Sequence, residues 1–137
     1  MKIVVDSSVA VKWLSSEGEQ YVSQADLILE HAGREKLELA APVFMKYEVG
    51  NALRYKKISE DGKLEILRQF YNIPIKFYGI SAKQAKTSFE MARQAGITFY
   101  DAVFMELAKR LGAALITANL KHQKSFPGVK VVDLKDY

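Results

Sequence analysis

The strongest constraint on the fold is an alternation along the chain between short apolar runs and longer segments with helical spacing. Residues 3–5 (Ile-Val-Val) form a continuous β-branched run, which is typical of a strand buried on both faces. Similar short runs occupy residues 37–40, 75–78, 114–117 and 129–132. Strands separated by helices are joined by right-handed crossovers, so the pattern predicts an α/β fold with a mostly parallel sheet of four or five strands flanked by helices.

Apolar residues at spacings of three and four predict helices between these strands. We expect a short helix after residue 6 and longer helices over about 19–34, 42–57, 59–72, 81–96 and 98–112. Pro42 is placed in the first turn of its helix, because its missing N–H has no partner there in any case. Ser59, Ser81 and Thr98 are expected to cap the helices that they precede.

Length and composition narrow the class of protein. A chain of 137 residues is expected to form one domain over residues 1–137, large enough for a proper hydrophobic core. The absence of Cys excludes disulfide scaffolds, thiolate nucleophiles and Cys-based metal sites. No apolar run exceeds four residues and no signal peptide is visible, so we expect a cytoplasmic protein without membrane contact. The net charge of +4 permits a polyanionic partner without requiring one.

Open parallel sheets bind ligands beyond the carboxyl ends of their strands, and oxygen-bearing side chains gather there in this sequence. Asp6 ends the first predicted strand, and Thr117 and Asn119 follow the fourth. Asp101 lies in the first turn of the helix that leads into the fourth strand. Each residue also has a purely structural explanation, since Asp, Thr and Asn are all common in helix caps and turns.

Glu48 is less easily explained by local structure. A helical wheel places it at the edge of the buried stripe of its helix, where a carboxylate needs a partner. An Arg, a Tyr hydroxyl or a metal ion would each serve. Carboxylates brought together repel one another unless a cation neutralises them. An all-oxygen ligand set suits Mg²⁺ or Mn²⁺, which can activate water and neutralise a phosphodiester in transit.

Four segments in order carry a resemblance to a known family: VVDSSVAVKW at 4–13, YEVGNAL at 47–53, TFYDA at 98–102 and LITAN at 115–119. Together they strongly resemble the PIN-domain nucleases, and within these the VapC-type toxins of toxin–antitoxin pairs. The resemblance covers essentially the whole chain. It implies a three-layer, Rossmann-like fold and an endoribonuclease that depends on Mg²⁺ or Mn²⁺ and leaves a 5′-phosphate. It also implies an RNA substrate, a cognate antitoxin and a homodimer.

The resemblance assigns roles to individual residues. The first three acidic positions of the family fall on Asp6, Glu48 and Asp101, with Asp6 and Asp101 holding the metal and Glu48 as a ligand or water-orienting base. The fourth acidic position falls on Asn119, which lowers the charge of the pocket by one and leaves open whether one ion or two are bound. Asn119 and Thr117 would position water, with Ser7 in a supporting role.

Basic residues near this site are candidates for contacts with the RNA backbone, because phosphate contacts need only positioned charge. Lys121 and Lys124 follow the fourth strand, and Lys12 lies on the helix after Asp6. His31 and His122 are isolated from acidic residues at metal-binding spacing, so we assign them to the surface or to local hydrogen bonds.

Other functions remain open at this stage. A PIN-fold RNA-processing nuclease without an antitoxin would carry the same residues. Asn119 is also compatible with a catalytically impaired PIN-fold binding module. A phosphoacceptor signalling domain is disfavoured, because a single Asp6 ends the first strand and no Asp follows the strand at 75–78.

Overall fold

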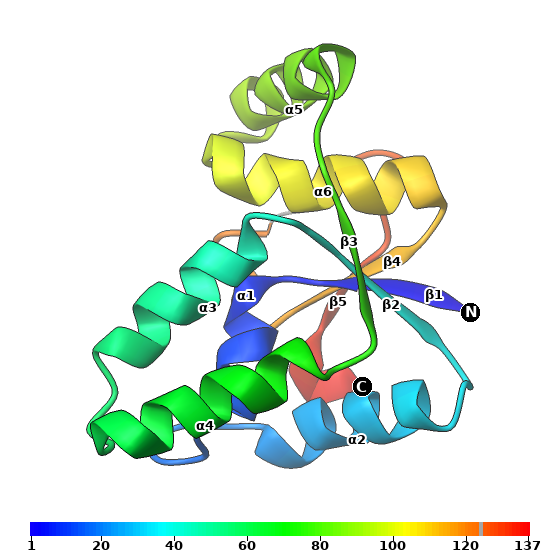
Figure 1. The fold of residues 1–137 in the computed structure, drawn as a ribbon. Helices are drawn as coiled ribbons and strands as arrows, with labels where there is room; N and C mark the ends of the chain where they lie inside the picture. Colours follow the sequence, from blue (N-terminus) through cyan, green and yellow to red (C-terminus); the bar gives the residue numbers. More distant parts are fainter. Residues whose placement is uncertain (124) are drawn as a thin grey trace.

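The computed structural model describes residues 1–123 and 125–137 (Figure 1). Its five strands form one sheet in the order β3-β2-β1-β4-β5, and every neighbouring pair is parallel. The strands are β1 (Lys2–Val5), β2 (Glu38–Pro42), β3 (Ile75–Tyr78), β4 (Ala114–Thr117) and β5 (Val131–Asp133). The predicted α/β fold with a parallel sheet is therefore confirmed.

Helices cover both faces of the sheet (Figure 1). Helix α6 packs against the sheet on one side, with α5 stacked on it, and α2 and α4 lie on the opposite side. The helical elements are α1 (Ser7–Ala10), η1 (Val11–Trp13), α2 (Val22–Gly33), α3 (Met45–Arg54), α4 (Glu60–Tyr71), α5 (Ala82–Ala95), α6 (Phe99–Leu111) and η2 (Leu134–Asp136). Within the described ranges, no helix has the length and apolar character needed to cross a membrane.

The central strand β1 pairs with β2 on one side and with β4 on the other. Val4 lies in register with Ala40 of β2 and with Leu115 of β4. Its neighbours Ile3 and Val5 are also buried, as the continuous apolar run predicts for a strand covered on both faces. Because parallel strands end at one edge, the residues after β1 and β4 are brought side by side.

The helix caps follow the predicted chemistry. Ser81 and Gln84 form a reciprocal capping box at the start of α5. The Ser59 hydroxyl accepts a hydrogen bond from the Gly62 N–H at 3.1 Å at the start of α4. Gly112 ends α6 in the left-handed conformation (φ 61°), where glycine has no steric penalty.

Two predicted helix boundaries are wrong. Pro42 is the last residue of β2 rather than the start of a helix, and α3 begins only at Met45. The chain stays extended because the Val43 N–H continues the strand ladder to the Tyr78 carbonyl at 2.9 Å. Helix α2 begins at Val22 rather than near residue 19, since Tyr21 takes a left-handed backbone conformation with φ 57°.

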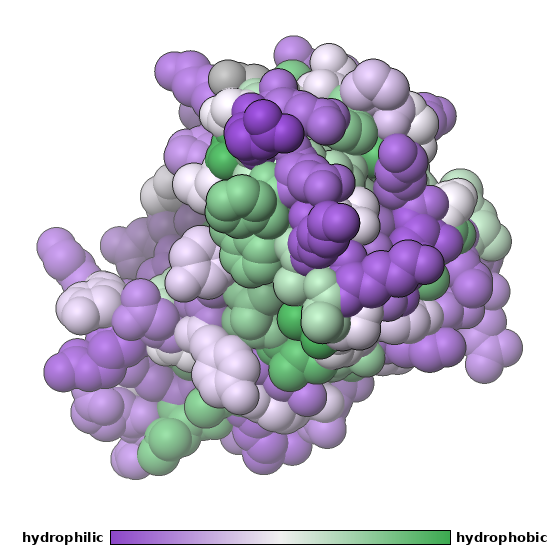
Figure 2. Space-filling view, turned by 90° about the horizontal axis from the view of Figure 1, so that it is seen from above, coloured by the Kyte–Doolittle hydropathy of each residue, from purple (hydrophilic) through white to green (hydrophobic). Residues whose placement is uncertain are grey.

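Several apolar helix residues face outward rather than into the core. Phe89 on α5 and Leu64 on α4 are each 65% exposed. Phe99 of α6 and Tyr71 of α4 are exposed as well, as is Ile80, which lies between β3 and α5. Figure 2, viewed from the α5 side, shows hydrophobic residues gathered in a band across this face between hydrophilic ones. The apolar residues of this chain therefore exceed what its core accommodates.

Candidate active site

An acidic cavity lies at the carboxyl ends of β1 and β4, as the topology predicts. Its volume is about 140 Å³. Four separate segments contribute to it: the turn after β1, helix α3, the start of α6 and the turn after β4. The residues that line it are Asp6, Ser7, Ser8, Glu48, Asp101, Phe104, Asn119 and His122. The fold thus brings together the three carboxylates and the amide on which the sequence prediction rests.

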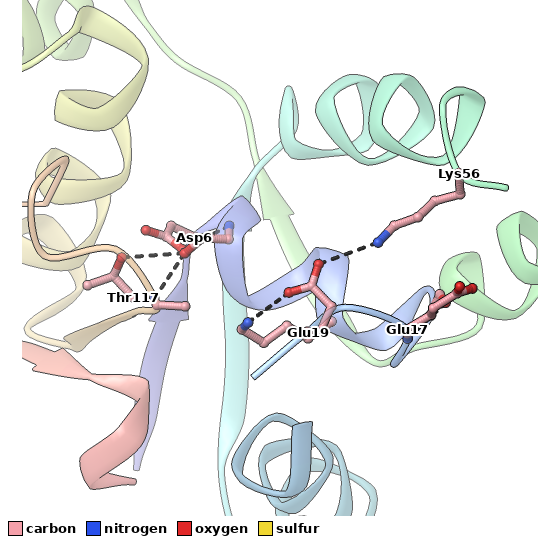
Figure 3. Close-up of polar contacts among 9 residues, drawn as sticks. Asp6, Glu17, Glu19, Lys56 and Thr117 are labelled. Atoms are coloured by element: carbon pink, nitrogen blue, oxygen red, sulfur yellow. Dashed lines mark hydrogen bonds and ion pairs between the residues drawn. The ribbon is translucent and has the colours of Figure 1, made fainter. Parts of the chain in front are cut away.

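Asp6 has the structural role considered for it and also lines the cavity. It is the N-cap of α1, and its Oδ1 accepts hydrogen bonds from the Ser8 N–H (3.0 Å) and from the Ser8 hydroxyl. Burial raises the pKa of Asp6 to about 6, against the effect of hydrogen bonds from Ser8 and Thr117. Figure 3 shows Asp6 and Thr117 side by side; the Ser8 hydroxyl, which donates to Asp6, lies 3.5 Å from the Thr117 hydroxyl. The carboxylate is fixed in place where its negative charge is costly.

Glu48 finds a partner that the sequence did not suggest. Its Oε1 accepts a hydrogen bond from the Ser7 hydroxyl at 2.7 Å, rather than from an Arg or a Tyr. Burial raises the pKa of Glu48, the Ser7 hydrogen bond lowers it, and the negative charge of Asp101 raises it further. The net pKa lies above the ordinary value. Repulsion between these two carboxylates would be relieved by a bound cation.

Asp101 is held at the start of α6 by its backbone. Its N–H donates to the Thr98 hydroxyl at 3.1 Å, which is one half of the predicted capping box. Its carbonyl accepts from the Gln123 side chain at 3.1 Å. These backbone contacts leave the carboxylate to line the cavity, where its Oδ2 lies 3.6 Å from His122 Nδ1.

The turn after β4 is tied to the turn after β1 through Ser8. The Ser8 hydroxyl accepts the Ala118 N–H at 2.9 Å and lies 3.5 Å from the Thr117 hydroxyl. Thr117 is fully buried, and its hydroxyl accepts the Asn119 N–H at 3.0 Å. The predicted turn chemistry of Thr117 is therefore present, and it sets Asn119 at the edge of the cavity.

Three residues that sequence reasoning did not place at the site belong to its surroundings. His122 is exposed, as predicted, but it also lines the cavity beside Asp101, with Nδ1 3.6 Å from Asp101 Oδ2, so it is not isolated from the acidic residues of the site. Ser8 and Gln123 contact Asp6 and Asp101 directly. The signal that was available is position alone, because each lies within six residues of the end of β1 or β4.

One predicted RNA contact is wrong. Lys12 is only 8% exposed, and its Nζ lies 2.9 Å from Glu19 Oε2. Glu19 also contacts Lys56 at 3.4 Å (Figure 3). Lys12 is therefore engaged in an ion pair away from the cavity. Lys121 is exposed after β4, and Lys124 lies outside the described residues.

The donor set fits a hard cation without forming a ready-made metal cluster. In the part of the chain that the structure describes, no three His, Cys, Asp or Glu side chains are grouped closely enough to hold an ion. Apart from the Phe104 ring, the cavity is nevertheless lined by polar groups, and all of its possible ligands except the His122 ring are carboxylate, amide or hydroxyl groups that offer oxygen. Two of its carboxyls have pKa values raised by burial, which is the electrostatic situation that a divalent cation stabilises.

Comparison with known proteins places this chain in a family. The PIN domain model matches residues 3–125. Ribonuclease VapC3 from Pyrobaculum aerophilum is 33% identical over 141 aligned positions, which cover 94% of this chain and 98% of the relative.

Solved structures agree in fold. VapBC2 from Rickettsia felis, bound to a promoter DNA fragment, matches with a TM-score of 0.70 at 18% identity, over 97% of this chain and 98% of its own. A toxin–antitoxin complex from Klebsiella pneumoniae matches with a TM-score of 0.67 at 18% identity, over 96% and 97%. The family match and the relative's identity over nearly the full length establish that the chain belongs to the PIN-domain family and, within it, to the VapC ribonucleases.

Proposed function

We propose that this chain is a divalent-metal-dependent endoribonuclease and the toxin of a toxin–antitoxin pair. The observation that carries the proposal is the convergence of Asp6, Glu48, Asp101 and Asn119 in one cavity. These residues come from four segments that are distant in sequence, and their oxygens match the ligand preferences of Mg²⁺ and Mn²⁺. Residues 1–137 would act as one catalytic domain.

Asp6, Glu48 and Asp101 would hold the ion, with the Asn119 amide oxygen as a neutral fourth donor. A divalent ion bound there supplies a polarised water and neutralises charge on the phosphodiester during hydrolysis. The neutral amide of Asn119 favours a site of lower charge than four carboxylates would make. This supports dependence on a single ion.

The remaining steps fall to side chains of the chain itself. Ser7 donates to Glu48 and sets the direction of that carboxylate. Glu48, held in this way, would either complete the ligand set of the ion or act as the base that accepts a proton from an attacking water. Ser8 and Thr117 fix Asp6, so the site is organised before substrate arrives. Lys121, which is exposed and directly precedes His122 of the cavity, would contact the RNA backbone.

The proposed partners are RNA, a cognate antitoxin and a second copy of the chain. Support for the antitoxin comes from the relatives solved as toxin–antitoxin assemblies from Rickettsia felis and Klebsiella pneumoniae. Support for a homodimer comes from the exposed apolar residues on the α5 side. An RNA substrate implies action in the cytoplasm.

Cleavage of single-stranded RNA with Mg²⁺ or Mn²⁺, and with EDTA, tests the proposal. Asp6→Asn and Asp101→Asn should each abolish cleavage, while Asp26→Asn, on the exposed face of α2, should leave it unchanged. Full divalent-dependent cleavage by Asp6→Asn would show that the site is assigned wrongly. Equal cleavage by wild type in EDTA would show that the metal is not required.

A further inference from the structure

A second cavity, with aromatic walls, adjoins the acidic one. It is open, measures about 420 Å³, and is lined by Phe44, Tyr47, Glu48, Asn51 and Tyr100. Glu48 lines both cavities, so the two share a wall. The volume lies within the roughly 300–1,000 Å³ that is typical of small-molecule sites. Tyr47 and Tyr100 directly precede the site acids Glu48 and Asp101 in the chain.

These tyrosines are not part of the hydrophobic core. Tyr47 is 74% exposed and Tyr100 is 63% exposed. The Tyr100 ring is braced from the side by Phe44, with ring centroids 5.5 Å apart in an edge-on arrangement. Phe44 in turn packs edge-on against Phe104, at 5.2 Å, and Phe104 lines the acidic cavity. A row of aromatic side chains therefore runs from the acidic cavity to the exposed ring of Tyr100.

We propose that this aromatic cavity binds an unpaired nucleobase of the RNA, next to the phosphodiester that is cleaved. The base would stack on Tyr100 or Tyr47, and the Asn51 amide would meet its hydrogen-bonding edge. Exposed aromatic rings bind bases in this way because every base has a π-face. The inference rests on the proposed ribonuclease function, and it adds the means by which the substrate is held.

The charge of the neighbouring cavity favours a base over a purely ionic contact. Three carboxylates line that cavity, and they repel RNA phosphates until a cation is bound. Substrate affinity close to the cleaved bond must therefore come in part from contacts that carry no charge. Stacking on Tyr47 or Tyr100 provides such a contact. The Asn51 side chain adds a neutral polar group to the cavity, which suits the polar edge of a base better than an apolar side chain of a partner protein.

The test measures binding of a labelled single-stranded oligoribonucleotide of mixed sequence by fluorescence anisotropy in EDTA, with cleavage in Mg²⁺ measured in parallel. At least one of Tyr47→Leu and Tyr100→Leu should weaken binding by about 5- to 150-fold, the range for loss of one stacked base. Tyr47→Phe and Tyr100→Phe keep the ring and should bind as wild type. Tyr55→Leu is the matched control, since Tyr55 is 78% exposed at the end of α3 and lines no part of this cavity.

Two further readouts separate stacking from a merely structural effect. An abasic oligonucleotide of the same length should bind wild type and the Leu variants equally weakly. The dependence of affinity on salt should keep its slope in the Leu variants, because no phosphate contact is lost. A change in that slope would contradict stacking.

The outcomes distinguish this inference from the proposed function. Wild-type RNA affinity in both Leu variants, with cleavage intact, overturns the inference and leaves the ribonuclease standing. Base-dependent binding without any cleavage supports the inference and overturns the hydrolase. If the Leu variants lose self-association but keep RNA affinity, the cavity is a protein interface and the inference is wrong.

Discussion

At the residue scale, the carboxylate of Asp6, which is proposed to bind the ion, lowers the stability of the metal-free protein at neutral pH. Its pKa is raised by burial to about 6 from an ordinary value of 3.8, so folding favours the protonated form. Above pH 6 the folded protein holds a buried carboxylate whose charge costs on the order of 3 kcal/mol without a cation. This cost declines as the pH falls from 6 towards 4, and it is absent below both the folded pKa of about 6 and the ordinary pKa of 3.8.

Asp6→Asn should therefore stabilise the metal-free protein at pH 7 while it abolishes cleavage. Asn caps a helix as well as Asp and still accepts the Ser8 hydrogen bonds, so we expect a gain of about 1–3 kcal/mol in the free energy of unfolding. Urea denaturation in EDTA at pH 7 and pH 4.5 measures this gain, which should shrink at the lower pH. A variant that is less stable than wild type at pH 7 would contradict this account of Asp6.

Asn119 permits the reverse experiment, in which a charge is added. Asn119→Asp would place a fourth carboxylate at the cavity, so stability should fall in EDTA and rise more steeply than wild type on addition of Mn²⁺. Thermal unfolding with and without Mn²⁺ measures both effects. Asn72→Asp at the exposed end of α4 is the control, because its unfavourable helix-dipole effect is the same with and without the ion. An identical Mn²⁺ response in Asn119→Asp and wild type would remove Asn119 from the site.

At the scale of elements, the ion pairs of Glu19 join three segments. Lys12 of η1 and Lys56, which follows α3, both contact Glu19, which precedes α2. Burial raises the pKa of Glu19, but hydrogen bonds and charges from the two lysines outweigh it, and the pKa lies below the ordinary 4.5. Its stabilisation is thus present above that value and is lost as pH falls through the folded pKa.

Glu19→Gln should destabilise the fold by about 1–3 kcal/mol at pH 7, between the values for exposed and for fully buried pairs. The reason is that Lys12, only 8% exposed, loses its counter-charge. Chemical denaturation at pH 7 and at pH 3.5 checks the size and the direction, since the difference from wild type should narrow in acid. Glu38→Gln breaks an exposed pair with Lys2 and should change stability by less than about 1 kcal/mol. Equal losses in the two variants would contradict a special role for Glu19.

The elements themselves could be predicted from sequence because their signals are local. Short runs rich in apolar residues marked the five strands, and Ser81 and Gly112 marked helix ends that the structure bears out. Pro42 was misplaced because its ring fits a strand end as well as a first helical turn, and the Val43 contact to Tyr78 decides between them. That contact joins residues distant in sequence, so no local signal reveals it.

For the candidate site too, topology could be predicted from the sequence, but individual contacts between distant residues could not. The meeting of Asp6 and Asn119 follows from parallel strands that end at one edge, so topology alone brings them together. The partner of Glu48 did not follow, because Ser7 reaches it only through the packing of α1 on α3. Lys12 was misjudged for the same reason, since Glu19 lies in a segment whose path the sequence pattern does not fix.

At the scale of the whole molecule, the apolar band on the α5 side is surface that stays exposed to solvent in a single copy of the chain (Figure 2). Phe89 lies on that side and is 65% exposed. A two-fold interface is built from the same patch on both copies, so a charge placed in it is set against its own symmetry mate as well as against apolar surface. One substitution therefore acts twice in a dimer.

Phe89→Arg should convert the proposed homodimer to a monomer, as measured by light scattering across a dilution series. Leu64→Arg is the matched control, because Leu64 is also 65% exposed but lies on α4, on the opposite side of the sheet. Both residues are exposed, so neither change should alter the free energy of unfolding of a single copy by more than about 0.5 kcal/mol. A monomeric wild type would refute the dimer, and a dimeric Phe89→Arg beside a monomeric Leu64→Arg would move the interface to α4. Loss of the dimer in Phe89→Arg alone would assign the apolar band to contact between copies of this chain.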